Sequence, residues 1–176
     1  MDKKEPTKPK IQYIHGSQTM LDDIRVMWEA LNRYHCDRSE HFKQHYRDMT
    51  FEKRKATLLK KAEGGEMSVD IALDEVTGKG VGYIVSTVNS EKVGEVQSIY
   101  VEASYRHMGV GCVLMRNALA WMDQHGATEK VVEVSYGNEA ALGFYGRFGF
   151  LPRLTLLKQE KKNNWPKFRC NRGKRL

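Results

Sequence analysis

The segment from Arg106 to Gly111, with the sequence RHMGVG, limits what this chain can fold into more than any other segment. It follows a strand-like run over residues 96–101 and precedes an amphipathic helical pattern that starts near Val110. A strand that leads through a glycine turn into a helix leaves several backbone N–H groups unpaired, with the positive end of the helix dipole behind them. Phosphate groups bind at such helix starts. The segment therefore predicts a pyrophosphate-binding loop, although an ordinary strand-to-helix connection also fits these residues.

The glycines and the arginine of this loop suit phosphate binding. Gly109 and Gly111 have no Cβ atom to keep a phosphate away from the main chain, and Arg106 can donate a charge-assisted hydrogen bond at the rim. Other phosphate motifs fit less well. A Walker loop requires a lysine where Cys112 stands, and a Rossmann fingerprint requires a third glycine where Leu114 stands. Neither an NTPase nor a nucleotide-dependent dehydrogenase is therefore indicated.

The segments after the loop extend the pattern. A helix is followed by a second strand-like run over residues 131–135, then by Asn138 and by the aromatic sequence FYGRFGF at residues 144–150. This order resembles the acyl-CoA-binding half of the GNAT superfamily of N-acetyltransferases, with specific motifs over residues 94–152 and only a similar architecture elsewhere. The resemblance implies an α/β (α+β) fold with a mixed, mostly antiparallel central sheet of about six to seven strands flanked by about four helices. It also implies acetyl-CoA as the co-substrate, without a metal ion.

The same resemblance assigns the cofactor contacts. In this superfamily the strand before the loop splays at a bulge and its main chain pairs with the pantetheine arm of CoA, with a backbone N–H near Val101 facing the thioester oxygen. Asn138 can cap a short helix, and in relatives an asparagine here also hydrogen-bonds the pantetheine arm. The full set of expected cofactor-binding residues is Ile99, Tyr100, Val101, Arg106, His107, Met108, Gly109, Val110, Gly111, Cys112, Asn138 and Tyr145.

Amide formation from a thioester and an amine also needs a proton donor for the thiolate and a proton acceptor for the amine. By resemblance, Tyr145 places its hydroxyl near the CoA sulfur, and a phenol of pKa about 10 can protonate a thiolate whose conjugate acid has a pKa of about 8.5 at modest cost. A plain role in an aromatic core is the alternative. Glu95 stands six residues before Val101, where histone-acetylating relatives carry a glutamate base. An exposed hairpin glutamate, with a water chain as the base, fits equally well.

These assignments predict an N-acetyltransferase that moves an acetyl group from acetyl-CoA to a primary amine by direct attack in a ternary complex. The alternative is a non-catalytic acyl-CoA-binding module with a basic tail that contacts nucleic acid, and turnover with any amine separates the two. The expected partner is a small-molecule or peptide amine. Polyamines, aminoglycosides, amino acids, protein N-termini and lysine side chains all stay open, as does homodimerisation.

Length and charge divide the chain into three parts. The 176 residues suit one domain, which we expect over residues 11–157. Residues 1–10 contain four lysines and two prolines and predict a flexible lead-in. Residues 158–176 hold eight basic side chains and one acidic one, which equals the whole formal charge of +7 and predicts a basic tail with weak polyanion contacts. Because no apolar run is long enough to span a membrane, we expect a cytoplasmic protein without membrane contacts.

The remaining elements follow from hydrophobic periodicity. Apolar residues at three-and-four spacing after Thr19, Tyr34 among them, predict a helix whose stripe belongs to the core. The polar and aromatic stretch over residues 36–50 is expected to cover a substrate cleft. The expected strands cover residues 11–15, 67–73, 81–88, 95–101, 131–135 and 150–157, and the expected helices start near Thr19, Phe51, Val110 and Asn138.

The histidines and cysteines give no metal motif. His41 and His45 are four residues apart, but no further ligand stands at a recognisable spacing. We interpret them as solvated histidines. Cys36, Cys112 and Cys170 are odd in number and far apart, which predicts reduced thiols.

Overall fold

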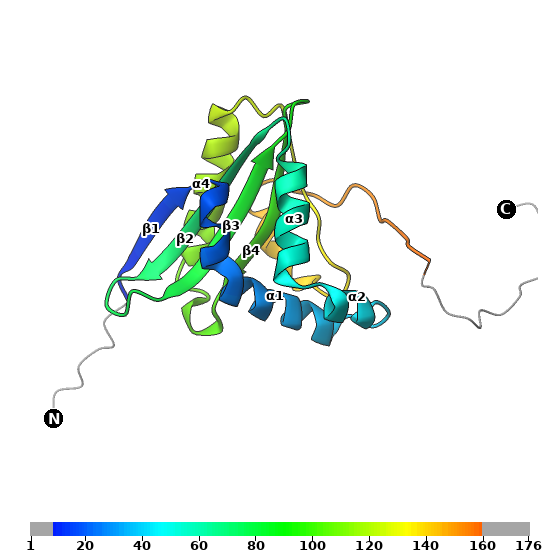
Figure 1. Cartoon of the computed structure of the whole chain (residues 1–176), viewed down its shortest axis with the longest axis horizontal. Helices are drawn as coiled ribbons and strands as arrows, with labels where there is room; N and C mark the ends of the chain where they lie inside the picture. Colours follow the sequence, from blue (N-terminus) through cyan, green and yellow to red (C-terminus); the bar gives the residue numbers. More distant parts are fainter. Residues whose placement is uncertain (1–8, 160–176) are drawn as a thin grey trace, which may run out of the picture.

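The computed structural model describes residues 9–159, which form one five-stranded sheet with helices packed on both faces (Figure 1). The strands lie in chain order: β1 Ile11–Gly16, β2 Glu66–Asp74, β3 Gly80–Val88, β4 Val93–Val101 and β5 Glu129–Val132. The α-helices are α1 Arg25–Arg38, α2 Lys43–Asp48, α3 Phe51–Lys61, α4 Val110–Gln124 and α5 Ala140–Gly146. Two 3-10 helices, η1 Gln18–Ile24 and η2 Ala103–Tyr105, precede α1 and α4.

The first four strands form an antiparallel meander, and β5 joins β4 in parallel. Asp74 sets the hairpin between β2 and β3, because its carboxylate accepts hydrogen bonds from the N–H groups of Val76 and Thr77, both at 2.9 Å. The Thr77 N–H, together with the Tyr105 hydroxyl at 2.8 Å, holds the pKa of Asp74 below its ordinary value. The antiparallel hairpins predicted for this part of the chain are confirmed.

Two apolar cores lie on opposite faces of the sheet. Figure 1 shows α1 and α3 in front of the sheet and α4 behind it. Leu21 of η1 and Leu58 of α3 are fully buried in the core under α1 and α3, and Leu114 of α4 is fully buried in the other, the α4 core. Side chains alternate along a strand, so Tyr83 of β3 belongs to the core under α1 and α3, and Ile84 belongs to the α4 core. The sheet is therefore covered on both faces, and a ligand has to enter at an edge or an opening.

The element count differs from the prediction. The sheet has five strands rather than six to seven, because residues 150–157, predicted as the last strand, form none. The four leucines of that segment, at positions 151, 154, 156 and 157, are between 74% and 88% exposed. Alternating apolar side chains form a strand only where a neighbouring backbone pairs with it. The helices number five rather than about four within residues 9–159, since α2 had no sequence signal, and β5 lies two to three residues earlier than predicted.

Most of the two chain ends lies outside the described residues. The predicted lead-in over residues 1–10 and the predicted basic tail over residues 158–176 therefore stay predictions, together with the tail's polyanion contacts. Between residues 9 and 159, no helix has both the length and the apolarity to cross a lipid bilayer. In the same range, no three His, Cys, Asp or Glu side chains are grouped so that they could hold a metal ion.

Leu58 and Leu59 are adjacent leucines of α3 in opposite environments, one fully buried and the other 37% exposed. Leu58→Ala should lower the free energy of unfolding by about 2–5 kcal/mol, because it leaves a cavity in the core. Leu59→Ala is the matched control and should lower it by less than about 1 kcal/mol. Denaturant unfolding followed by circular dichroism measures both. Equal losses would contradict the placement of α3 on the sheet.

Candidate active site

β4 contains one extra residue near its centre. Val85 of β3 lies opposite Ser98, but the next residue, Ser86, lies opposite Val96, so Gln97 has no partner in β3 and forms a β-bulge. The parallel pairing of β4 with β5 also ends at Val96. The second half of β4 therefore has an edge that no strand of the described chain covers.

Arg54 of α3 holds this bulge. Its Nη2 donates a hydrogen bond of 2.7 Å to the backbone carbonyl of Gln97, while the Gln97 side chain donates to the Thr87 hydroxyl at 3.0 Å. Burial lowers the pKa of Arg54, although a guanidinium stays charged at any physiological pH. The hydrogen bond supplies the bulge carbonyl with a charged donor, and such bonds contribute about 1.5–3 kcal/mol.

The three residues predicted to pair with the pantetheine arm lie along the open edge. Ile99 and Val101 pack against the α4 core, whereas Tyr100 packs against the core under α1 and α3. All three are half-buried. Because packing occupies their side chains, their backbone groups are what this edge can offer to an extended ligand.

After β4 the chain passes through η2 and the loop of residues 106–109 into α4. The first backbone hydrogen bond of α4 runs from the Val113 N–H to the Gly109 carbonyl at 3.1 Å. The N–H groups of residues 109–112 therefore have no acceptor inside the helix, and the dipole of the 15-residue helix adds positive potential there. The loop turns through positive φ angles of 64° at His107 and 90° at Gly109. This is the geometry that the sequence predicted for a phosphate-binding loop.

The side chains of this loop leave the helix start accessible. A Cβ atom at Gly109 would meet no atom within 4 Å, and one at Gly111 would come no closer than 3.5 Å to an aromatic ring. Met108 is 52% exposed and Cys112 is half-buried. Val110 is buried in the α4 core, so only its backbone is available to a ligand.

Tyr145 of α5 lies on the α4 side of the sheet and is 8% exposed. Its ring contacts Phe144 and Phe150 edge to face, with centroid distances of 5.4 and 6.2 Å. Burial raises the pKa of Tyr145 to about 12, above the ordinary value of about 10 on which the sequence-based expectation rests. The hydroxyl is therefore always protonated at physiological pH, but it is a weaker acid than a solvated phenol.

Glu95 lies on the opposite face of the sheet, two residues before the bulge. Its two carboxylate oxygens accept hydrogen bonds from the Lys61 ammonium of α3 at 2.7 and 2.9 Å, and its side chain is 21% exposed. The structure thus separates the two predicted catalytic side chains, with Tyr145 in the α4 core and Glu95 beside α3. As a base, Glu95 would have to exchange Lys61 for the amine or for water.

Asn138 does not cap α5, so that prediction was wrong. The N-cap residue is Glu139, and no side chain caps this helix start. The Asn138 N–H donates to the Ser135 carbonyl at 3.0 Å in a turn, and the side chain is directed to α1, where its Oδ1 accepts a hydrogen bond from the Tyr34 hydroxyl at 3.3 Å. Contact of Asn138 with a cofactor stays a prediction.

Sequence analysis missed two residues of this region. Tyr34 belongs to the apolar stripe that predicted a core helix, and Arg54 is one of several basic residues of α3. Arg106 connects Tyr34 to β4, because its Nε donates to the Val101 carbonyl at 2.9 Å and its guanidinium carbon lies 5.7 Å from the Tyr34 ring centroid. Tyr34 and Arg54 are recognised only by their contacts with residues far away in the sequence, and no local pattern marks them.

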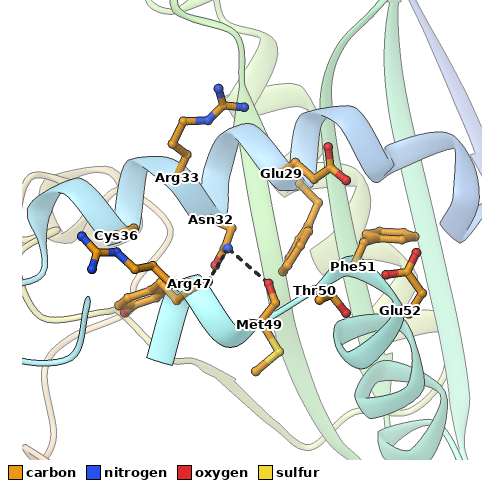
Figure 2. A pocket seen from close by; sticks show the side chains of 11 residues that line it. Glu29, Asn32, Arg33, Cys36, Arg47, Met49, Thr50, Phe51 and Glu52 are labelled. Atoms are coloured by element: carbon orange, nitrogen blue, oxygen red, sulfur yellow. Dashed lines mark hydrogen bonds between the residues drawn. The ribbon is translucent and has the colours of Figure 1, made fainter. Parts of the chain in front are cut away.

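A hollow of about 410 Å³ lies between α1, α2 and the start of α3 (Figure 2). The Asn32 amide of α1 donates to the carbonyls of Tyr46 at 2.8 Å and Met49 at 3.4 Å, which fastens α2 to α1. Trp28 and Phe51 line the hollow, together with two glutamates and two arginines. The stretch predicted to cover a substrate cleft thus contributes α2 to the wall of this hollow.

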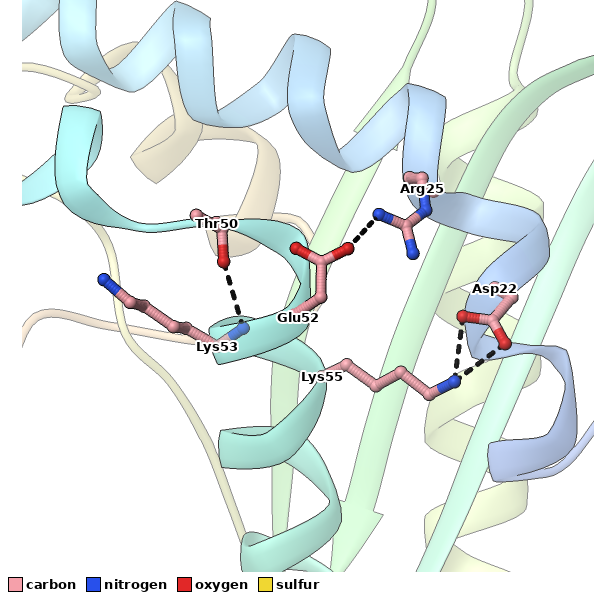
Figure 3. A network of polar contacts seen from close by, with 6 residues as sticks. All are labelled: Asp22, Arg25, Thr50, Glu52, Lys53 and Lys55. Atoms are coloured by element: carbon pink, nitrogen blue, oxygen red, sulfur yellow. Dashed lines mark hydrogen bonds and ion pairs between the residues drawn. The ribbon is translucent and has the colours of Figure 1, made fainter.

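Charged pairs hold α3 against η1 and α1 beside the hollow (Figure 3). The Lys55 ammonium contacts both carboxylate oxygens of Asp22, at 2.7 and 2.8 Å, and Arg25 pairs with Glu52. Thr50 caps α3 by accepting a hydrogen bond from the backbone N–H three residues later, at 3.3 Å. Exposed ion pairs contribute only about 0–1 kcal/mol each, so these contacts orient the helices more than they stabilise the fold.

Residues 26–150 match the sequence profile of the acetyltransferase (GNAT) family. The chain belongs to this family. It is 32% identical over 84 residues to an uncharacterized N-acetyltransferase from Methanocaldococcus jannaschii, and the aligned segment covers 43% of this chain and 36% of that protein. It is also 32% identical over 77 residues to an N-alpha-acetyltransferase from Arabidopsis thaliana, where the aligned segment covers 42% of this chain and 40% of that protein. The match thus spans less than half the length of either relative.

The GNAT architecture is also that of an aminoglycoside N-acetyltransferase solved in complex with CoA. The two structures have a TM-score of 0.64, with 90% of this chain and 99% of that chain covered. Their sequence identity is 16%, so this likeness concerns the fold alone. The mixed, mostly antiparallel GNAT sheet expected from the sequence is confirmed, with fewer strands.

The loop geometry predicts that CoA binding depends on the two glycines. Replacing both Gly109 and Gly111 with Glu should abolish CoA binding in isothermal titration calorimetry, because two side chains and two negative charges enter the space before the helix start. The matched double Gln variant has the same bulk and the same strain at the positive φ of Gly109. The charge alone should therefore make the Glu variant weaker than the Gln variant by at least about tenfold. Unchanged CoA affinity in a folded Glu variant would show that the phosphates bind elsewhere.

Proposed function

We propose that this GNAT-family protein moves an acetyl group from acetyl-CoA to a primary amine by direct attack in a ternary complex. The observation that carries the proposal is the continuity between the open edge of β4, which begins at Gln97, and the loop of residues 106–109. An extended pantetheine arm can pair with a free strand edge while the helix start of α4 binds the pyrophosphate. The two N-acetyltransferase relatives support the same reaction.

In this mechanism the amine nitrogen attacks the thioester carbon, a C–N bond forms, and the C–S bond breaks. A backbone N–H near Val101 stabilises the oxyanion. Tyr145 donates a hydrogen bond to the departing thiolate. The pKa of Tyr145 is about 12 and that of a thiol about 8.5, so complete proton transfer would be uphill by about 5 kcal/mol. Stabilisation of the thiolate by a neutral phenol is therefore the proposed role.

The amine must lose a proton before it attacks, because its ordinary pKa lies near 10. Glu95 is the proposed acceptor of this proton, either directly or through one water molecule. Its position beside α3 means that the amine would enter from the face of the sheet that α1 and α3 cover, where the hollow of Figure 2 lies. The thiolate would then leave on the α4 face, beside Tyr145.

The acceptor class is best tested with a panel of amines. The relative named an N-alpha-acetyltransferase favours peptides with a free N-terminus, and the structural neighbour named an aminoglycoside N-acetyltransferase adds aminoglycosides. With acetyl-CoA, we expect free thiol to be released in the presence of peptide N-terminal amines. If CoA binds but no amine raises thiol release above the rate without an acceptor, the protein is a non-catalytic acyl-CoA-binding module instead.

Tyr145→Phe removes the proposed hydrogen-bond donor and keeps the ring in the core. It should lower kcat by roughly 10- to 1000-fold and change the affinity for CoA by less than about twofold. Tyr13→Phe, which removes a hydroxyl from the distant strand β1, is the control and should leave kcat unchanged. A wild-type kcat in Tyr145→Phe would make Tyr145 an aromatic core residue without a role in catalysis.

A further inference from the structure

We propose that Tyr34 of α1 is a positioning residue for acetyl-CoA, because it fixes the side-chain amide of Asn138 so that the amide nitrogen faces the pantetheine arm. This inference rests on the proposed function, in which the pantetheine arm pairs with the open edge of β4. It adds α1 to a cofactor site that the sequence motifs place on β4, the loop of residues 106–109, the start of α4, Asn138 and α5.

Three segments that are far apart in the chain meet at the Tyr34 ring. The hydroxyl donates to Oδ1 of Asn138 at 3.3 Å, across 104 residues of sequence. Arg106 of the phosphate-binding loop lies 5.7 Å from the ring centroid and also donates to the Val101 carbonyl at the end of β4. Val101, Arg106, Tyr34 and Asn138 therefore form a bridge from the open edge of β4 to the segment after β5.

The ring of Tyr34 is itself held in place. The Arg38 guanidinium carbon lies 3.9 Å from the ring centroid, which is a close cation–π contact. The same turn of α1 packs directly on Gly137, where a Cβ atom would come within 2.7 Å of the Arg38 carbonyl oxygen and where φ is +89°. Only glycine allows this approach without strain. The approach of α1 to Gly137, the residue before Asn138, is thus built into the backbone.

The hydrogen bonds of Asn138 leave one group available. Its N–H donates to the Ser135 carbonyl and its carbonyl accepts from the Ala141 N–H, both at 3.0 Å. Oδ1 accepts from Tyr34, and Nδ2 donates no hydrogen bond within residues 9–159. A tyrosine hydroxyl can donate or accept, and here it donates to the amide oxygen, which turns Nδ2 away from Tyr34. Nδ2 is then left to donate to a carbonyl oxygen of the pantetheine arm.

The test compares two ligands, CoA and adenosine 3′,5′-bisphosphate, which lacks the pantetheine arm. Tyr34→Phe keeps the ring and its contacts with both arginines and removes only the hydroxyl. Calorimetry should show CoA binding weakened by about 3- to 10-fold, the effect of one lost hydrogen bond, and binding of the bisphosphate unchanged. In an Asn138→Ala background, Tyr34→Phe should have no further effect. Tyr13→Phe on β1 is the control and should change neither ligand.

Asn138→Asp is a second variant for the case in which Tyr34→Phe lowers the unfolding temperature. A carboxylate still accepts from Tyr34 but donates no hydrogen bond, so CoA affinity should fall at least as far as in Asn138→Ala. Equal weakening of both ligands by Tyr34→Phe, or the same loss in the Asn138→Ala background, would overturn the inference, as would unchanged CoA affinity. If the wild-type protein binds no CoA, the proposed function fails first. If the wild-type protein binds CoA and acetylates an amine, and Tyr34→Phe binds CoA with the same affinity as the wild type, only the inference fails.

Discussion

The extra residue in β4 is the constraint on which the rest of the site depends. Gln97 has no partner in β3, and the pairing of β4 with β5 ends one residue earlier, at Val96. Beyond this point the N–H and C=O groups along that edge of β4 have no strand partner within residues 9–159 and are available to an extended ligand. Arg54 stabilises the irregular strand, because its half-buried guanidinium supplies the donor that the bulge carbonyl would otherwise lack. One inserted residue thus leaves an open strand edge that leads directly to a helix start.

The sheet also keeps the two titratable side chains of the proposed mechanism apart. Glu95 contacts Lys61 of α3, and Tyr145 belongs to the α4 core on the other face. In the tetrahedral intermediate of acyl transfer, the entering amine and the leaving thiolate are separate substituents of one carbon. In the proposed mechanism, the open edge of β4 lets the amine contact Glu95 on one face of the sheet and the thiolate contact Tyr145 on the other.

Local sequence patterns predicted most of the fold, and long-range contacts decide the rest of the site. The loop of residues 106–111 and the hairpins follow from glycines and side-chain periodicity within short windows. Arg54 and Tyr34 act on partners 43 and 104 residues away, so no window contains both members of either pair. The strand predicted over residues 150–157 failed for a related reason. Alternation describes the side chains of one strand, while strand formation requires a second backbone.

Burial keeps the tyrosine side chains near the open edge of β4 in the neutral form, in which they can donate a hydrogen bond. It raises the pKa of Tyr83 and of Tyr145, so neither side chain is a phenolate at neutral pH. The fully buried Ser86 hydroxyl, on β3 beside the bulge, has no hydrogen-bond partner within residues 9–159. The same low dielectric strengthens any hydrogen bond that a neutral phenol donates to a thiolate. Because a neutral phenol cannot accept the proton of an ammonium ion, the proposed mechanism assigns that proton to Glu95 or to water.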